Sequence, residues 1–540
     1  MIYDRSMSLS HASPISFIPF TLVVSLISVL ITSQNRALLR PPTTTTTIQA
    51  CGVNQNSRMT SSLSRYEESV RLLNSLQSNA ATIKKLRGQR ENLQAMNLPQ
   101  CRKYLESLRI SDKELNALNI IHVSGTKGKG STCAYAEAIL RHQGLRTGLY
   151  TSPHLIHVRE RIRIDGEPVD ETTFAEEFFH VYDIIKKEHN DNMPAYFKFL
   201  TLLAFRIFIK MNVEVVVLEV GIGGEYDCTN VIEKPKVCGV TTLDYDHISI
   251  LGSKLSEIAW HKAGIFKKDV PAIYSPTTTE AEEVLISRAA SKSTPLSKAP
   301  PVSTYNFARQ IAPGISGIHQ FSNISLALQL VRTWAEKCEF SLPGVTFSTK
   351  TNGFDVPLWM CDAIESCRWP GRSQVVNTDR NITYLLDGAH TPKSMEACSE
   401  WAQEEIVHFK KENVKKILLF QCTADRCPST LIQYLKPLGI SQIISCPTQL
   451  YSSVDKSADS TNLNASRDEQ MEKAAQCVKS WKESMDHPNG KVFDCISSAF
   501  EFIESEASPS QEILVLVTGS LHLVGGVLNL IEAKTHQKLV

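Results

Sequence analysis

A loop rich in glycine and lysine, residues 125–131 (GTKGKGS), stands between a short apolar segment and a helical pattern. Glycines allow backbone N–H groups to turn toward a phosphate, and the positive end of the following helix favours the negative charge. Lys129 is suited to neutralise the β- and γ-phosphates of a nucleotide. The loop departs from a Walker A sequence, because Val123 holds the first glycine position and Gly130 follows Lys129 where serine or threonine is expected. We therefore expect a phosphate site whose metal takes an oxygen ligand from elsewhere.

Three further polar groups come directly after predicted strands. Ser152 lies in a Ser-Pro-His turn, Glu219 closes a β-branched run, and Asp246 and His247 follow another apolar run. A charged Glu219 within such apolar sequence is costly unless a cation is paired with it. Hydroxyl, carboxylate and imidazole together suit Mg²⁺, with waters completing its octahedron. A single histidine after a strand is more often structural, but the shared position beside a phosphate loop favours the metal site.

The elements that must position these side chains form two series of alternating strands and helices. The first series has predicted strands at 119–123, 145–150, 213–220 and 237–243 and a helix at 132–142. The second has predicted strands at 383–386, 416–420, 441–445 and 513–517. Alternation of this kind predicts an α/β fold with mostly parallel sheets. Ligands bind such sheets at the carboxyl ends of the strands, where the polar groups above are found.

The two series predict two domains behind a leader. We expect a leader at 1–58, a nucleotide-binding α/β domain at 59–345, a linker at 346–370 and a second α/β domain at 371–540. The polar stretch from Ser452 to Asp468 has the composition of a mobile surface insertion. No internal repeat is visible.

Composition excludes several classes of function. With 57 Lys and Arg against 56 Asp and Glu, the 540-residue chain has a formal net charge of +1 and lacks the basic excess of a nucleic-acid-binding protein. Its 42% hydrophobic and 21% charged residues are typical of a soluble globular protein. The 14 cysteines show no CxxC pair and no zinc-like spacing. We expect them to be reduced core residues.

The N-terminus differs from the rest of the chain. Between Asp4 and Glu67 there is no acidic residue, whereas several arginines are present, which favours a mitochondrial presequence. The apolar stretch 15–31 leaves a short membrane anchor as the alternative, although Pro19 and three serines weaken a spanning interpretation. Membrane association is expected only through this stretch. A second methionine, Met59, allows a shorter cytosolic form.

Seven motifs in order carry a resemblance to a known family. They are residues 125–131 (GTKGKGS), the Ser-Pro-His turn at Ser152, and residues 219–224 (EVGIGG), 317–323 (GIHQFSN), 369–372 (WPGR), 386–390 (LDGAH) and 517–522 (VTGSLH). Together they resemble folylpolyglutamate synthases, which are relatives of the Mur ligases. Residues 227–230 (DCTN) and 259–267 (AWHKAGIFK) resemble the animal branch in particular. The resemblance covers about residues 60–540.

This resemblance implies a Mur ligase-like fold, with an N-terminal P-loop NTPase-like domain and a C-terminal Rossmann-like domain. It implies ATP binding by Thr126, Lys127, Gly128, Lys129, Gly130, Ser131, Asn323, Arg372 and Asp387, and Mg²⁺ binding by Ser152, Glu219 and His247. His390 and Ser520 match positions for glutamate placement, and Lys129, Lys262 and His390 are the implied catalytic residues. The implied partners are ATP, L-glutamate, reduced folates and folylpolyglutamates, with a monovalent cation such as K⁺ as a further cofactor. A monomer located in the mitochondrion (inner membrane or matrix) and the cytosol is expected.

The implied reaction is ATP-dependent addition of glutamate to the γ-carboxyl of folate. A carboxylate is a poor electrophile, so ATP first phosphorylates it to an acyl phosphate, which the glutamate amine then attacks. Mg²⁺, Lys129 and backbone amides would stabilise the transferred charge. The sequence does not identify the base that deprotonates the amine.

Two residues in the motifs need separate interpretation. The family equivalent of Lys262 can be carbamylated, which requires a neutral amine with a depressed pKa. The alternative is a solvated lysine on a helix. Ile248 stands where relatives often have threonine, and the lost hydroxyl would loosen the surroundings of His247.

One hypothesis concerns arginines outside the motifs. Residues 158–166 alternate like a strand that ends in an Asp-Gly turn, which would place Arg159, Arg161 and Arg163 on one face. Such a basic row could receive the anionic folate or its glutamate tail, with Arg161 as the leading residue. The alternative is a solvated strand edge.

Three rival functions stay open at this point. A dihydrofolate synthase, or an enzyme with both activities, shares the nucleotide machinery and differs in the carboxylate that enters. A GTPase switch is disfavoured because no Asn/Thr-Lys-x-Asp motif is found. A binding protein that has lost turnover is the third possibility.

Overall fold

The computed structural model describes most of the chain after the N-terminal leader region. The described residues are 63–77, 90–345, 352–409, 414–422, 426–453, 459, 465–485 and 489–540. Residues 62–540 form one compact unit. The predicted leader and its apolar stretch 15–31 lie outside the described residues. Within the described part of the chain, no helix is both long and apolar enough to cross a membrane.

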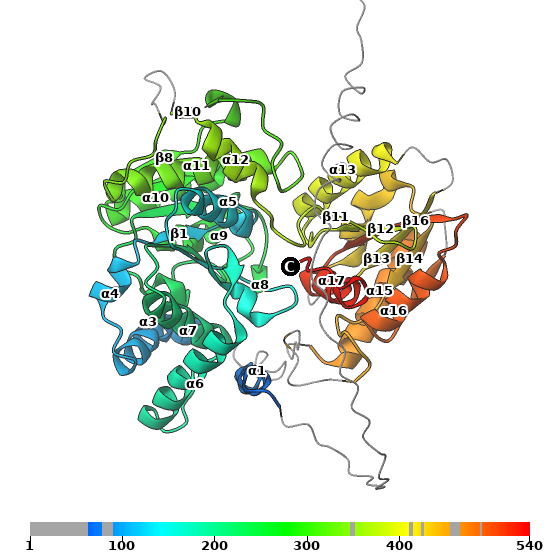
Figure 1. Cartoon of the computed structure of the whole chain (residues 1–540), viewed down its shortest axis with the longest axis horizontal. Helices are drawn as coiled ribbons and strands as arrows, with labels where there is room; N and C mark the ends of the chain where they lie inside the picture. The colour runs from blue at the N-terminus through cyan, green and yellow to red at the C-terminus, as the bar shows by residue number, and fades with distance from the viewer. Residues whose placement is uncertain are drawn as a thin grey trace, which may run out of the picture. The chain divides into compact units, whose positions relative to one another are not determined.

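The first part of the unit, in which Figure 1 labels β1 and β8, is built on an eight-stranded sheet with the order β4-β3-β2-β5-β1-β6-β7-β8. Its parallel strands are β1 (Ile121–Ser124), β2 (Thr147–Tyr150), β5 (Val215–Glu219), β6 (Val237–Val240), β7 (Ala272–Tyr274) and β8 (Leu296–Lys298). Two antiparallel strands, β3 (Ile162–Ile164) and β4 (Glu167–Pro168), extend one edge. Because β1, β2, β5 and β6 run parallel side by side, their carboxyl ends meet at one edge of the sheet.

Both faces of this sheet are buried, and β5 shows how. Val215 and Val217 belong to one core with helices α5 (Lys129–His142), α11 (Gln320–Lys337) and α12 (Leu358–Ser366). Val216 and Leu218 belong to a second core, with α1 (Arg65–Ser75), α3 (Arg90–Ser107), α4 (Asp112–Ala117), α6 (Glu171–Glu188) and α7 (Tyr196–Lys210). A strand that is buried on both sides has no polar face, which is why the sequence shows one continuous apolar run.

Smaller elements complete this part. They are α8 (Ile248–Leu251), α9 (Leu255–Lys262), α10 (Thr279–Lys292), the strand pair β9 (Asn306–Phe307) and β10 (Asp355–Val356), and the 3₁₀ helices η2 (Val158–Arg161), η3 (Cys228–Val231), η4 (Ala263–Ile265) and η5 (Val302–Thr304). Helices α9 and α10 pack on each other and close a third core around β6 and β7.

The second part is built on a six-stranded sheet with the order β11-β12-β16-β13-β14-β15. Strands β12 (Ile382–Leu386), β16 (Glu512–Thr518), β13 (Val414–Phe420), β14 (Gln442–Ser445) and β15 (Gly490–Val492) are parallel, and β11 (Gln374–Asn377) is antiparallel at the edge. Helices α16 (Ile496–Ser505) and α17 (Leu521–Thr535) lie side by side on one face (Figure 1). The other face carries α13 (Pro392–His408), α14 (Pro428–Ile432), the 3₁₀ helix η6 (Gln433–Leu438) and α15 (Arg467–Ser484).

The predicted fold class is confirmed, since two mostly parallel sheets are each covered by helices on both faces. The predicted strands of both series are present, with ends that coincide or are shifted by at most three residues. Within the expected linker, Phe354, Met360 and Ile364 are buried in the core around α5 and α11. The division into domains stays a prediction, and this packing places any flexible joint after α12.

Candidate functional site

A cavity of about 850 Å³ lies where residues of both sheets come together. Of the residues predicted for the site, Thr126, Lys127, Gly128, Lys129, Gly130, Ser131, Ser152, Arg161, Glu219, His247, Asn323, Arg372, Asp387 and His390 line it. Lys262 and Ser520 do not line the cavity. The structure thus brings together side chains from segments that are hundreds of residues apart.

The glycine-rich loop joins β1 to α5 and opens toward the cavity. The amides of Thr126 and Lys127 both donate to the Thr242 carbonyl at 3.1 Å, which folds the loop back on the sheet. Gly128 precedes α5 with a φ of 84°, and a Cβ there would lie 2.1 Å from Asn323 Oδ1. Only glycine fits this position. The N-terminal end of the 14-residue α5 is therefore left exposed to an anion in the cavity.

The departure of the loop from a Walker A sequence has a steric reason. A Cβ at Gly130 would lie 3.0 Å from the indole Nε1 of Trp369. The guanidinium of Arg163 lies over the same indole, 5.3 Å from the ring centroid. A serine at position 130 would press on the Trp369 indole, which would have to shift by a few tenths of an ångström.

Glu219 ends β5 as a carboxylate that is only 3% exposed. Its Oε2 accepts from the Ser152 amide at 2.9 Å, while its Oε1 is 3.9 Å from Lys129 Nζ, beyond hydrogen-bond distance. Burial raises the pKa of Glu219, and Lys129 opposes this shift. A cation at Oε1 would stabilise the ionised form, so this carboxylate fits a metal ligand.

His247 adds an imidazole to the same wall. It adopts a left-handed φ of 52° directly before α8, which turns the residue at the end of the loop that follows β6. Desolvation lowers the pKa of His247 to about 4, although Asp246 opposes this, so the ring is neutral at physiological pH. Carboxylate, neutral imidazole and the Ser152 hydroxyl fit a hard cation that keeps several waters. No group of three or more His, Cys, Asp or Glu suited to a metal occurs among the described residues.

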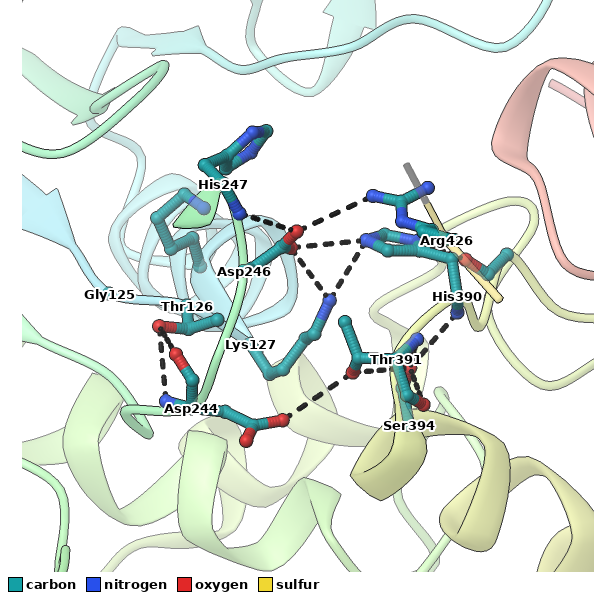
Figure 2. A network of polar contacts seen from close by, with 12 residues as sticks. Gly125, Thr126, Lys127, Asp244, Asp246, His247, His390, Thr391, Ser394 and Arg426 are labelled. Atoms are coloured by element: carbon teal, nitrogen blue, oxygen red, sulfur yellow. Dashed lines mark hydrogen bonds and ion pairs between the residues drawn. The ribbon is translucent and has the colours of Figure 1, made fainter. Parts of the chain in front are cut away.

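Lys127 connects the first sheet to the second (Figure 2). Its Nζ donates to Asp246 Oδ2 at 3.1 Å and to His390 Nε2 at 2.9 Å. Desolvation lowers the pKa of Lys127 to about 8, and Asp246 limits the shift. Although burial raises the pKa of Asp246, the charge of Lys127 holds it well below its usual range. The loop lysine is thus held by a carboxylate from its own sheet and a histidine from the other.

The contacts of His390 assign its tautomer. Its Nδ1 lies 2.8 Å from the Gly388 carbonyl, an acceptor only, so Nδ1 carries the proton. Nε2 therefore accepts from Lys127. Burial lowers the pKa of His390 to about 3, with the charge of Lys127 adding to the effect, which keeps the ring neutral. His390 is held in place as an acceptor at the cavity wall.

Arg426 and Asp244 belong to the site although the sequence reasoning did not select them. Arg426 Nη2 lies 3.4 Å from Asp246 Oδ1, so Asp246 faces cations from both sheets (Figure 2). Asp244 exchanges hydrogen bonds of 3.1 Å with Thr126 and accepts from Thr391 Oγ1 at 3.4 Å. Arg426 could have been found from its place in the segment after β13, by the strand-end rule that selected Glu219.

Lys262 is buried, being 3% exposed, so the alternative of a solvated lysine is wrong. Its Nζ donates to the Gly125 carbonyl at 2.6 Å, directly beneath the phosphate loop. Burial and the nearby Lys129 lower its pKa well below the usual value. A neutral amine, as carbamylation requires, is therefore consistent with its surroundings.

The predicted basic row of Arg159, Arg161 and Arg163 is wrong. Residues 158–161 form the 3₁₀ helix η2, and β3 begins only at Ile162. The Glu160 carboxylate accepts from the amides of residues 155, 156 and 157, which bends the chain into a turn. Arg161 still lines the cavity, but Arg159 donates to the Val169 carbonyl and Arg163 lies over Trp369.

The remaining predicted residues lie around the cavity. Asn323 is buried and donates to Gln320 Oε1 at 2.9 Å. Asp387 follows β12 and accepts from the amides of Ser373 at 2.8 Å and Ala389 at 2.9 Å, which fixes the loop that carries Arg372. Ser520 directly precedes α17 without a capping hydrogen bond from its side chain, and it is next to Leu521 and His522, which line the cavity.

Known proteins are similar to this chain in sequence. A family model described as "Dihydrofolate synthetase, C-terminal domain" matches residues 373–530. A "Putative folylpolyglutamate synthase" of Caenorhabditis elegans is 79% identical over 509 residues, which cover 93% of this chain and 99% of the relative. The "Folylpolyglutamate synthase, mitochondrial" of Cricetulus griseus is 37% identical over 545 residues, which cover 87% of this chain and 92% of the relative.

Solved structures agree with the fold. "E.coli FolC in complex with DHPP and ADP" matches with a TM-score of 0.60 and 25% identity, over 78% of this chain and 92% of that one. A Mycobacterium tuberculosis folylpolyglutamate synthase complexed with ADP matches with a TM-score of 0.65 at 21% identity, over 86% of this chain and 98% of that one. By the extent of its identity to these relatives, the chain belongs to the folylpolyglutamate synthase family.

Proposed function

We propose that this protein is a ligase that uses ATP to add L-glutamate to the γ-carboxyl of reduced folates and folylpolyglutamates. The observation that supports this most directly is that one cavity is lined by the phosphate loop and Glu219 of the first sheet and by Arg372, Asp387 and His390 near the second. The name of the C. elegans relative, at 79% identity, supports this reaction. Related structures from E. coli and Mycobacterium tuberculosis are complexes with ADP or with an ATP analogue, which supports the nucleotide.

We assign the divalent cation to Ser152, Glu219 and His247, and propose Mg²⁺ as that cation. A relative from Yersinia pestis is described in complex with AMPPNP and a Mn ion, which supports a divalent metal beside the nucleotide. When bound, the metal would neutralise phosphate charge as a Lewis acid. A monovalent cation such as K⁺ is a further proposed cofactor. Carbamylation of Lys262 would add a carboxylate beneath the loop.

The chain's own residues serve the first step by holding charge. The folate γ-carboxylate attacks the γ-phosphorus of ATP, and an acyl phosphate and ADP form. Lys129, Lys127 and the amides at the start of α5 stabilise the transferred phosphoryl group. Asn323 contacts the adenine, and Arg372 and Asp387 hold the nucleotide. Because the cavity is walled by both sheets, it limits access of water to the acyl phosphate.

In the second step the amine of L-glutamate attacks the acyl phosphate, a tetrahedral intermediate forms, and phosphate leaves. Glutamate brings two carboxylates, and we propose that they are met by Lys127, which lines the cavity, and by Arg426, which contacts Asp246. His390 offers its neutral Nε2 as an acceptor once Lys127 turns to a glutamate carboxylate, and Ser520 lies beside the lining residue Leu521. A glutamate carboxylate that replaced Asp246 as the partner of Lys127 would leave the lysine paired.

Location and assembly are further parts of the proposal. The mitochondrial relatives from Cricetulus griseus, Bos taurus and Homo sapiens support a mitochondrial form. We propose a second, cytosolic form that starts at Met59, a monomeric enzyme, and domains at 59–345 and 371–540.

Dihydrofolate synthesis is the second candidate function. The matched family model is that of a dihydrofolate synthetase C-terminal domain, and the related E. coli structure is a complex with DHPP and ADP. Replacing folate with dihydropteroate in the same assay tests this activity. Glutamate incorporation into dihydropteroate would establish a bifunctional enzyme.

The test is incorporation of labelled glutamate into tetrahydrofolate with ATP and Mg²⁺. Wild type should incorporate label, and Glu219→Gln should lose at least about a hundredfold in rate because the metal loses its carboxylate. Glu137→Gln is the matched control, since Glu137 is also 3% exposed but is paired with Arg141 and Thr147, away from the cavity. Glu137→Gln should keep the rate. Absence of incorporation by folded wild type that binds ATP would refute the proposed reaction.

A further inference from the structure

Asp459, within the polar insertion expected between Ser452 and Asp468, contacts the first part of the molecule. Residues 452–468 were expected to form a mobile surface insertion, and 454–458 and 460–464 lie outside the described residues. Asp459 itself meets α1 and the segment that follows the Ser-Pro-His turn, both beside the eight-stranded sheet. These contacts join residues about 300 or more positions apart in the sequence, and through His154 they reach the buried cavity residue Arg161. We therefore looked for a functional role of Asp459.

The side chain of Asp459 is held by two strong donors. Its Oδ1 accepts from the Tyr66 hydroxyl at 2.6 Å and from the Val158 amide at 2.8 Å. His157 Nδ1 lies 3.6 Å from Oδ2, and Asp459 raises the pKa of His157. Hydrogen bonds to an ionised carboxylate are shorter and stronger than neutral ones. The carboxylate therefore fixes where the backbone of residue 459 lies.

The backbone carbonyl of Asp459 in turn fixes a histidine. His154 Nε2 lies 3.1 Å from this carbonyl, which can only accept, so the ring carries its proton on Nε2. His154 is 6% exposed, and burial together with Arg161 lowers its pKa well below the usual value, so the ring is neutral. Nδ1 is then an acceptor, and Arg161 Nε donates to it at 2.9 Å.

Arg161 is the end of this chain of contacts. It is 8% exposed, its guanidinium lies over the Tyr196 ring at 5.5 Å, and it lines the cavity that also contains Glu219. Because its Nε–H donates to His154, the two terminal amino groups of Arg161 are the donors that can bind an anion. A guanidinium held by a neutral acceptor keeps its full charge for a ligand.

We propose that Asp459 is a positioning residue that acts through His154 to aim Arg161 at the carboxylate end of the folate substrate. This inference rests on the proposed function for the identity of the substrate. The ligand class is an aryl-linked glutamate or oligoglutamate anion. Asp459 does not line the cavity, so its effect belongs to folate affinity and not to phosphoryl transfer.

The test compares steady-state kinetics of the full chain and its variants. Asp459→Ala should raise the KM for tetrahydrofolate about tenfold, with kcat and the KM for ATP within about twofold of wild type, because one charge-assisted contact is lost. Asp459→Asn should restore the KM, since its amide oxygen can still accept from Tyr66 and Val158. Asp468→Ala, an exposed acidic residue at the start of α15, is the matched control and should behave as wild type.

A double mutant separates positioning from general stabilisation. Arg161→Ala should raise the same KM, and Arg161→Ala with Asp459→Ala should do no more than Arg161→Ala alone, because both remove one interaction. Effects that multiply would show that Asp459 does not act through Arg161 and would overturn the proposal. An equal rise in the KM for ATP would also overturn it.

Two readouts keep this result separate from the proposed reaction. Calorimetry of tetrahydrofolate binding to wild type and Asp459→Ala measures the contribution of Arg161 to folate affinity even without turnover. A protein that binds folate but incorporates no glutamate would therefore refute only the proposed reaction. Hydrogen exchange of the Val158 amide should accelerate in Asp459→Ala and stay slow in Asp459→Asn. An unchanged Val158 amide in Asp459→Ala would show that the contact is not formed.

Discussion

Lys127 stands between opposing electrostatic effects. Removal from water favours its neutral form, while Asp246 at 3.1 Å favours its charged form. Desolvation is the larger effect, and the pKa falls from 10.5 to about 8. At pH 7 the lysine is therefore still mostly charged, because its pKa lies only about one unit above this pH. A triphosphate in the cavity would raise this pKa again, because the protonated form gains a second anionic partner.

The pH dependence of nucleotide binding follows from this shift. If the complex holds the Lys127 proton more tightly than the free protein, binding takes up a proton above pH 8 and affinity falls as pH rises. Below pH 8 the free protein is already protonated and this contribution disappears. The dissociation constant of an ATP analogue should rise above pH 8 by at most about tenfold per unit.

Lys127→Arg is the control for that titration, since guanidinium stays charged across the range. Its dissociation constant should stay flat between pH 7 and 9.5 when measured by calorimetry. A flat profile for wild type would show that Lys127 does not gain an anionic partner from the nucleotide.

At the scale of elements, the strand-to-helix turn from β1 to α5 depends on a glycine. Gly125 has a φ of 139°, and a Cβ there would lie 1.8 Å from Thr241 Oγ1 and 2.9 Å from the Thr241 amide nitrogen. Gly144, after α5, also has a positive φ of 80°, but nothing lies within 4 Å of its Cβ position. Alanine substitutions at these two glycines therefore distinguish the cost of backbone strain alone from the cost of strain together with a steric collision.

Gly144→Ala should lower the free energy of unfolding by about 1 kcal/mol, the cost of a left-handed alanine. Gly125→Ala should cost at least about 3 kcal/mol, because the collision adds to the strain and β6 must move. Thermal or urea unfolding measures both. Equal losses for the two variants would contradict the close approach of Gly125 to Thr241.

The segment 158–164 shows where element prediction stops. Alternating arginine and apolar residues are typical of a strand, and β3 is indeed a strand from Ile162. The earlier half is a 3₁₀ helix because the Glu160 side chain satisfies three backbone amides that a sheet neighbour would otherwise bind. A side chain that competes for backbone donors is not visible in a pattern of hydropathy.

For the whole molecule, the compact unit that begins at Ser62 predicts that the preceding residues are not needed for activity. A chain starting at Met59 keeps all of this unit, including α1. In α1 the Ser64 cap contacts Glu67, and Tyr66 donates to Asp459. This shorter chain should therefore retain the rate of glutamate incorporation of the full chain, within about twofold. A chain starting at residue 77 would lose α1 and serves as the comparison, with a higher KM for tetrahydrofolate expected. Loss of activity on starting at Met59 would contradict the self-sufficiency of the unit.

The sequence by itself determined the features that depend on near neighbours. The phosphate loop needs glycines within a few residues of one another, and the buried strands need continuous apolar runs because helices cover both faces of the sheet. The rule that ligands bind at the carboxyl ends of parallel strands placed Ser152, Glu219 and His247 on one wall. These features rest on backbone geometry and periodicity, which a short stretch of sequence encodes.

Only the tertiary structure decided which distant side chains meet. Asp246 faces Lys127, His390 and Arg426 across sequence separations of 119, 144 and 180 residues. The burial of Lys262 and the contact of Asp459 with Val158 likewise depend on how helices and loops pack. Pairings of this kind are set by the shape of the folded chain, and electrostatic effects on pKa follow from burial and from neighbours within a few ångströms. No local pattern contains that information.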